Sequence, residues 1–122
     1  MGLVIIKPDA FTRRLVGVIL TRLETLSPIR KLYSHTFSPR DCDVHYKDHI
    51  GRSYYGALCD HMQSGTSLIL EINADWHTLR VAALEIRCST LMGCEGPKNL
   101  IHAPDSEDAE ARESTYWLPV AR

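Results

Sequence analysis

Hydrophobic residues in this chain follow two spacings, and segments of the two kinds alternate. Continuous hydrophobic runs are typical of strands buried on both faces of a sheet, and they lie at 3–6, 67–72 and 100–101. A looser alternation predicts one more strand at 29–37. Hydrophobic residues three and four apart predict helices at 11–25, 54–62 and 76–84. Two more polar helices are expected, from about 38 to 49 and after residue 104.

Local start and stop signals mark the boundaries of these segments. Lys7-Pro8-Asp9 ends the first strand, because proline disfavours helix at the residue before it, and Asp9 is expected to cap the next helix. Ser38 and Pro39 start a helix with proline at its first position. The glycine- and proline-containing stretch 88–98 is expected to be a loop.

The order of the predicted elements indicates the fold class. Without the two short helices at 38–49 and 54–62, the order is strand, helix, strand, strand, helix, strand. That is the βαββαβ order of the ferredoxin-like split unit. We therefore expect one α+β domain over residues 1–122, with an antiparallel sheet and helices on its faces.

Composition and charge narrow the function classes. The hydrophobic content of 44% and the charged content of 24% are ordinary for a globular protein. A net charge of −1 gives no overall positive field, so we expect no nucleic-acid partner. No hydrophobic run is long enough to span a membrane and no signal-peptide pattern begins the chain, so we expect no membrane partner.

The cysteines bear on the compartment in which the protein works. Cys42, Cys59, Cys88 and Cys94 show no CxxC spacing, which indicates neither a zinc site nor a disulfide framework. Buried thiols in a reducing compartment are the simplest interpretation, and we expect a cytoplasmic protein.

One stretch near the end of the chain carries candidate chemistry. His102 follows the strand at 100–101, and Pro104-Asp105-Ser106 then starts an acidic helix in which Glu113 lies two turns along. A histidine at a strand-to-helix junction, with a carboxylate able to lean back to it, is compatible with a catalytic site and also with an ordinary structural pair. No ligand geometry can be argued for His45, His49 or His61, which we assign to polar helix faces.

Several motifs in this order resemble the nucleoside diphosphate kinases. They are Ile5-Ile6-Lys7-Pro8-Asp9-Ala10, Leu15-Val16-Gly17, His45-Tyr46, Ser64-Gly65, and Asn99-Leu100-Ile101-His102 with Asp105-Ser106 and Glu113. The resemblance covers almost the whole chain and implies the same ferredoxin-like fold. It also implies reversible transfer of a terminal phosphoryl group from a nucleoside triphosphate to a nucleoside diphosphate, through a phosphohistidine. The implied cofactor is Mg²⁺, bound through the nucleotide phosphates with no direct protein ligand.

The resemblance also implies roles for individual residues. His102 would be the nucleophile, Glu113 the carboxylate that holds the far side of its ring, and Lys7 a third catalytic residue. The phosphates would be held by Lys7, Tyr46, Arg80 and Arg87, and the sugar by Asn99 with Lys7. Tyr54 would stack on the base with Leu58 beside it, and stacking accepts any base.

The chain also departs from the family pattern. The serine usual two residues after the nucleophile, which helps to orient the glutamate and histidine, is Pro104 here. A serine restored at this position should speed phosphorylation about tenfold, and less if Glu113 already has another partner. The loop between Arg80 and His102 is short, so Ser89 or Thr90 would have to replace a usual threonine. Gly96 stands where a hydrophobic residue usually covers the base.

Three interpretations of the function follow. An active nucleoside diphosphate kinase needs Lys7, Arg80, Asn99, His102 and Glu113 together, and all five are present. The alternative is a nucleotide-binding regulatory relative with little or no kinase activity. A ferredoxin-like nucleic-acid binder ranks third, since no basic strand face with paired aromatic residues is visible. Because the shortened loop removes part of the contact that family hexamers use, a dimer-based homo-oligomer is expected.

Overall fold

The computed structural model describes residues 1–89 and 96–118. The strands are β1 (Gly2–Ile6), β2 (Ile29–Thr36), β3 (Thr66–Ile72) and β4 (Ile101–His102). The helices are α1 (Pro8–Thr12), α2 (Val16–Leu26), α3 (Pro39–His45), the 3₁₀ helix η1 (Lys47–His49), α4 (Tyr55–Gln63), α5 (Trp76–Cys88) and α6 (Glu107–Trp117). None of the described helices is long and hydrophobic enough to span a membrane.

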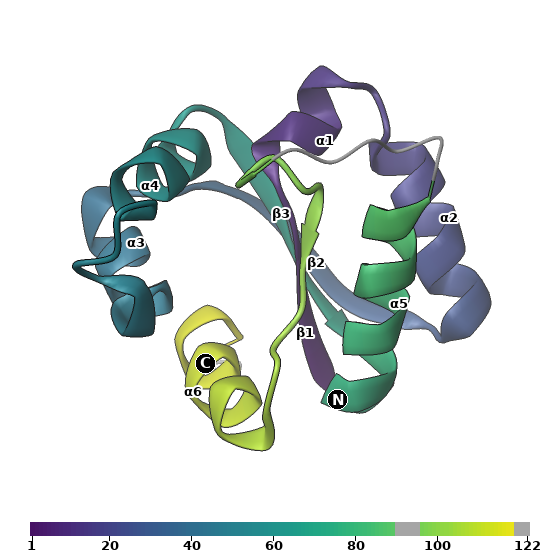
Figure 1. The fold of residues 1–122 in the computed structure, drawn as a ribbon. Coiled ribbons are helices and arrows are strands. Elements are labelled where there is room, and N and C mark those ends of the chain that lie inside the picture. The colour runs from purple at the N-terminus through teal and green to yellow at the C-terminus, as the bar shows by residue number, and fades with distance from the viewer. Residues whose placement is uncertain (90–95, 119–122) are drawn as a thin grey trace.

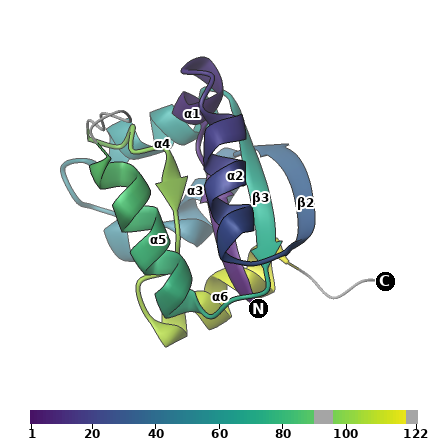
Figure 2. The same cartoon turned by 90° about the vertical axis from the view of Figure 1, so that its right-hand side faces the viewer.

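The strands form a four-stranded sheet in the order β2-β3-β1-β4. All three neighbouring pairs are antiparallel, and β1 lies in the centre between β3 and β4. Figures 1 and 2 show α2 and α5 on one face of this sheet, and α3, α4 and α6 on the other. This arrangement confirms the predicted ferredoxin-like fold, with α3, η1 and α4 inserted between β2 and β3.

The alternation of side chains along β1 places hydrophobic residues on both faces, as expected for a central strand. Val4 and Ile6 pack with Ile19 of α2 and Leu79 of α5 in one core cluster. Leu3 and Ile5 belong to a second cluster, formed with α3, α4 and α6. The members of the second cluster on those helices are Cys42, Leu58, Cys59, Met62 and Trp117, and Tyr46 follows the end of α3. The helix pair α3 and α4 is therefore held against the sheet.

The prediction of one helix over 11–25 was wrong. The structure has two helices, because Arg14 lies in the left-handed region with a φ of 58° and breaks the helix. The expected role of Asp9 was also wrong. The N-cap of α1 is Lys7, and Pro8 occupies the start of the helix. The Asp9 side chain is instead buried and used in tertiary contacts.

The other elements differ from the prediction mainly in length. The predicted helix 76–84 would have ended before Arg87. α5 instead runs to Cys88, so Arg87 lies in its last turn. The helix expected to reach residue 49 ends at His45, and η1 continues from Lys47. Within the predicted loop 88–98, residues 90–95 lie outside the described part of the chain.

Candidate functional site

The pairing of β1 with β4 brings residues near the start of the chain next to residues near its end. His102 pairs with Ile5, and Ile101 pairs with Ile6, in the antiparallel ladder of β1 and β4. The chain leaves β1 directly into Lys7, whose backbone N–H donates to the carbonyl of Leu100 at 2.8 Å. Lys7 and His102, which are far apart in the sequence, therefore lie at the same edge because of strand pairing.

A strained turn precedes β4 and sets the position of the site residues on it. Leu100 has a φ of 72°, in the left-handed region that residues other than glycine seldom adopt. Its N–H donates to Oδ2 of the buried Asp9 at 3.1 Å, and its carbonyl accepts from Lys7. These bonds hold the turn, so Asn99 faces Lys7 while His102 follows on the strand.

His102 and Glu113 form the pair expected from the sequence. Nε2 of His102 lies 2.6 Å from Oε1 of Glu113, whose side chain is 6% exposed. With the carboxylate ionised, Nε2 must donate, so the neutral ring carries its lone pair on Nδ1. Burial first, and then the charges of Lys7, Arg87 and Arg80, hold the pKa of His102 well below its usual value. The ring is therefore neutral near pH 7, as a nucleophile requires.

Positive side chains lie around His102. Nζ of the buried Lys7 donates to Oδ1 of Asn99 at 2.7 Å and to the carbonyl of Pro97 at 3.2 Å. Arg80 and Arg87 come from α5 and donate to the carbonyls of Ala103 and Ile101, on either side of His102. The two arginines thus tie α5 to the strand that carries the histidine.

Two cavities open at this edge, and together they contain most of the predicted site residues. One, of about 280 Å³, is lined by Lys7, Tyr54, Leu58, Gly96, Pro97 and Asn99, and we name it the Tyr54 cavity. The other, also of about 280 Å³, is lined by His45, Tyr46, Asp48, His49, Arg80, His102, Asp105, Arg112 and Glu113, and we name it the His102 cavity. His49 of the second cavity hydrogen-bonds the hydroxyl of Tyr54 in the first, so the cavities are neighbours.

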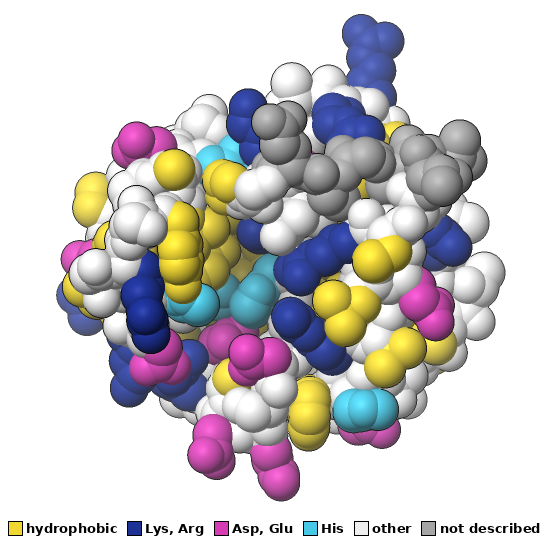
Figure 3. Space-filling view, viewed as in Figure 1, with side chains coloured by type: hydrophobic (Ala, Val, Ile, Leu, Met, Phe, Trp, Pro, Cys, Tyr) yellow, Lys and Arg dark blue, Asp and Glu magenta, His cyan; other side chains and the backbone are white. Residues whose placement is uncertain are grey.

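The surface over these cavities has a distinct chemical pattern. Figure 3 shows a hollow in which histidine side chains lie between a hydrophobic wall and a cluster of lysine and arginine side chains. An apolar wall suits a nucleobase, and the cations suit phosphate groups. Arg87 lines neither cavity, but its charge lowers the pKa of His102 and so acts on the same site.

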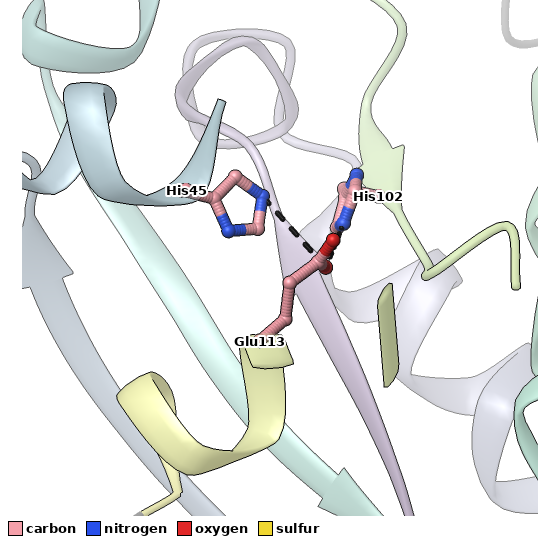
Figure 4. Close-up of side chains that lie close together, drawn as sticks. All are labelled: His45, His102 and Glu113. Carbon is pink, nitrogen blue, oxygen red and sulfur yellow. Dashed lines mark hydrogen bonds and ion pairs between the residues drawn. The ribbon is translucent and has the colours of Figure 1, made fainter. Parts of the chain in front are cut away.

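The sequence interpretation of His45 was wrong. His45 ends α3, its side chain is fully buried, and its ring centroid lies 4.5 Å from that of His102. Figure 4 shows both rings directed at the carboxylate of Glu113. The spacing of Cys42 and His45, three residues apart on a helix, already indicated a shared face, and Cys42 is in the core. Only the tertiary structure shows which residues that face meets.

The interpretation of His61 was also wrong. Its Nε2 lies 3.0 Å from Oδ1 of Asp9, and both side chains are buried. The pair links α4 to α1. Asp9 also accepts from the backbone N–H of Leu100 in the strained turn. His61 therefore helps to hold Asp9, and through it the turn, without lining either of the two cavities.

Three departures from the family pattern can be located. Pro104 is buried and has no donor. Gly96 lines the Tyr54 cavity beside Pro97, so a second wall exists there without a hydrophobic side chain at 96. Ser89 is the C-cap of α5, whereas Thr90 lies outside the described residues.

One group of side chains has the spacing of a metal site. The ligand atoms of His45, His102 and Glu113 lie within 4.8 Å of one another. Mg²⁺ prefers oxygen ligands, and two of these three residues would offer nitrogen. The group therefore does not suit Mg²⁺.

Comparisons with known proteins give a consistent result. A family profile described as "Nucleoside diphosphate kinase" matches residues 1–84. The nucleoside diphosphate kinase of Acanthamoeba polyphaga mimivirus is 35% identical over 130 aligned positions, covering 98% of this chain and 93% of that protein. The enzyme of Cutibacterium acnes is 32% identical, covering 96% of this chain and 93% of its own length. The solved structure of Aquifex aeolicus nucleoside diphosphate kinase matches with a TM-score of 0.80 at 26% identity, covering 94% of this chain and 92% of that one.

Proposed function

The chain belongs to the nucleoside diphosphate kinase family, and we propose that it transfers the terminal phosphoryl group between nucleoside triphosphates and diphosphates through phosphorylated His102. One observation carries the assignment of the nucleophile. A neutral imidazole is held at Nε2 by the buried Glu113 and is surrounded by the charges of Lys7, Arg80 and Arg87. A regulatory relative that only bound nucleotides would not require this pair, so we favour the enzyme.

The reaction follows from the tautomer of His102. The lone pair on Nδ1 attacks the terminal phosphorus, the bond from that phosphorus to the bridging oxygen breaks, and the nucleoside diphosphate leaves with the electron pair. Glu113 stabilises the positive charge that builds on the ring. A terminal phosphate oxygen of a second diphosphate then attacks the phosphohistidine, the N–P bond breaks, and the neutral imidazole returns.

The remaining site residues bind and orient the nucleotide in this proposal. Lys7, Tyr46, Arg80 and Arg87 hold the phosphates, because preorganised cations and donors stabilise charge on the transferring group. Asn99 with Lys7 contacts the sugar. Tyr54, a residue that is 48% exposed, stacks on the base in the Tyr54 cavity, and Leu58 lies beside it.

Mg²⁺ is part of the proposal as a partner of the nucleotide. Bound to the phosphates, it would neutralise part of their negative charge and orient them. Asp48, Asp105 and Glu113 line the His102 cavity, but among the described residues the group with metal-site spacing is His45, His102 and Glu113, and two of these three offer nitrogen. The other site residues include the cations Lys7, Arg80 and Arg87. The site residues therefore fit a phosphate-bound ion better than a protein-bound one.

The experiment that tests the function detects the intermediate directly. The protein is incubated with γ-labelled ATP and Mg²⁺, and we expect acid-labile, alkali-stable label on the wild type. His102→Ala should carry no label and transfer no phosphoryl group, while nucleotide affinity stays within about threefold, since His102 supplies a nucleophile more than a binding contact. Equal labelling of the two proteins would refute the assignment of His102.

We also propose a homo-oligomer based on a dimer. β2 is an edge strand of the sheet, and its outer residues Leu32 and Tyr33 are 53% and 39% exposed. An edge strand has backbone groups that no neighbouring strand pairs, and here it also exposes two large hydrophobic side chains, so a second copy can pack against it. Light scattering at micromolar concentration should give more than a monomer for the wild type, and Leu32→Glu should lower the mass. A strict wild-type monomer would contradict this proposal.

A cytoplasmic location is the last part of the proposal. Within the described residues Cys42, Cys59 and Cys88 are free thiols, which supports a reducing compartment. Recovery of the native protein from a secreted or membrane fraction would contradict it.

A further inference from the structure

The tautomer of His45 is fixed by a neighbour on α6. The indole N–H of Trp117 donates to Nδ1 of His45 at 2.9 Å, and both residues are buried. An indole nitrogen can only donate, so Nδ1 must accept. Burial first, and then the positive charge that His102 can carry, lower the pKa of His45 well below its usual value, which keeps the ring neutral. The single ring proton of His45 therefore lies on Nε2.

This Nε2–H points at the catalytic pair without a hydrogen-bond partner of its own. In the described part of the chain, Nε2 of His45 is one of a few buried side-chain atoms that lack one. It lies 4.0 Å from Oε1 of Glu113, the same oxygen that accepts from His102 (Figure 4). A movement of about 1 Å would bring the donor into hydrogen-bond range. An orphaned buried donor at this position calls for an explanation.

Glu113, in turn, is short of donors. The hydrogen bond from His102 is the one recorded for its carboxylate among the described residues, and Nη2 of Arg112 is 3.7 Å from Oε2, too long for a second. Pro104 supplies neither a hydroxyl nor an N–H. A buried carboxylate normally needs further donors to stay ionised. Its charge matters most when the ring of His102 becomes positive.

We propose that His45 is a positioning residue that donates from Nε2 to Glu113 during phosphoryl transfer, and that Trp117 fixes its tautomer for this task. The donor missing at Pro104 is thus supplied from α3. This inference rests on the proposed function, because it concerns the same phosphohistidine reaction. It explains how a chain with proline at 104 keeps its glutamate and histidine oriented.

The inference predicts a pH dependence, to which all charged groups near Glu113 contribute. Burial first raises the pKa of Glu113, Asp105 raises it too, and Arg112, Arg80 and a charged His45 lower it. Besides His102, these groups come from α3, α5, α6 and the segment before α6. Of them, His45 has a neutral donor directed at the carboxylate. The buried hydroxyl of Tyr46 also lacks a partner and lines the same cavity, and burial first, and then negative charges that include Glu113, raise the pKa of Tyr46. Loss of the His45 donor should raise the pKa of Glu113 and move the acid limb of the phosphorylation rate to higher pH.

The experiment measures the rate of His102 phosphorylation by rapid quench, from pH 5 to 8, in full-length variants. His45→Phe keeps a ring and removes the donor, and we expect a rate about tenfold lower, with the acid limb about one pH unit higher. Trp117→Phe keeps the stacking on Phe37 and frees the His45 tautomer, so a smaller change in the same direction is expected. Tyr116→Phe is the matched control. Tyr116 lies next to Trp117 on α6 and donates to Asp41 of α3, so its variant loses a hydrogen bond between the same two helices and should leave both values unchanged.

A rescue separates positioning from a merely structural role. Pro104→Ser should change the wild-type rate less than about threefold, because Glu113 already has a second donor, but it should restore most of the rate lost in His45→Phe. A His45→Phe protein with a wild-type rate and acid limb would overturn the inference. So would a slow His45→Phe protein whose acid limb is unmoved and which Pro104→Ser does not restore. A wild type that never becomes phosphorylated would instead refute the proposed function.

Discussion

Glu113→Gln tests the contact on which the mechanism depends. The carboxylate lies 2.6 Å from Nε2 of His102 and is almost fully buried. Glutamine has nearly the same shape and can still accept through its amide oxygen, so the ring keeps its tautomer and its place. Glutamine lacks the negative charge of the wild-type carboxylate, which should stabilise the positive ring of phosphorylated His102.

The magnitude follows from the kind of hydrogen bond that is lost. A bond to a charged group contributes about 1.5–3 kcal/mol and a neutral bond about 0.5–1.5 kcal/mol. The difference of about 1–2 kcal/mol corresponds to a phosphorylation rate about 5–30-fold lower. Nucleotide affinity should change little, because Glu113 contacts the ring and not the predicted phosphate cations.

The pH dependence of the phosphorylation rate gives a second, independent test of Glu113. Burial raises the pKa of Glu113, and a raised carboxylate pKa makes the wild-type rate fall as acid protonates it. In Glu113→Gln that group is gone, and only the protonation of His102 remains. Burial holds the pKa of His102 below its usual value, and loss of the neighbouring negative charge lowers it further, so the acid limb of the variant should move to lower pH.

Single-turnover phosphorylation by γ-labelled ATP is the assay for both values. Glu110→Gln is the control, because Glu110 lies on the same helix but accepts from Ser114 and from the backbone of Leu3, away from His102. The control should behave as the wild type. Equal rates for Glu113→Gln and wild type, with coincident acid limbs, would refute the view that this carboxylate orients and stabilises the ring.

Substitutions at three other residues test the phosphate contacts, the stacking on the base and the stability of the fold. Arg80→Ala should lower kcat/KM, because about 2–4 kcal/mol of transition-state stabilisation is lost with the cation. Unchanged steady-state kinetics would exclude a role of Arg80 in binding the phosphates. Tyr54→Ala should raise KM for all nucleotides, because about 1–3 kcal/mol of stacking on the base is lost. Tyr54→Phe keeps the ring and should leave KM unchanged. An increase in KM confined to one base would contradict this role of Tyr54. Burial raises the pKa of Asp41, but hydrogen bonds from Ser38, Tyr116 and His35 together outweigh it and lower this pKa from 3.8 to about 2. Asp41→Asn should therefore unfold in less urea at pH 7, and the stability difference from wild type should shrink as pH falls from about 4 to 2. A difference independent of pH would show that the carboxylate charge is not involved.

The sequence predicted the strands of this protein well because their signal is local. The continuous run in β1 and the run in β3 require burial on both faces wherever the strands lie, so their existence and order followed from the hydrophobic pattern along the sequence. The order of elements then left few topologies, and the ferredoxin-like one was correct. The break near Arg14 was missed because the hydrophobic spacing of α2 continues upstream without a proline or glycine to mark it.

Residues that act through distant partners could not be predicted in the same way. His102 and Glu113 were found because they are close in sequence and their motif is specific. His45 was not, since its partners Trp117 and Glu113 lie on α6, more than sixty residues away in the sequence, and no local pattern records that contact. Asp9 looked like a helix cap because its neighbours favour one. Tertiary packing used it to hold Leu100 and His61 instead.

The sequence by itself therefore determined which segments are buried, their order, and the residue types of the site, because periodicity and motifs are properties of neighbouring positions. The tertiary structure decided the protonation state and orientation of those residues. The indole of Trp117 places the proton of His45 on Nε2, and the carboxylate of Glu113 leaves Nδ1 of His102 with its lone pair. Burial first, and then the charges of Lys7, Arg87 and Arg80, keep the ring of His102 neutral. Such effects depend on distances of a few ångströms between atoms from different elements, and only the folded chain sets those distances.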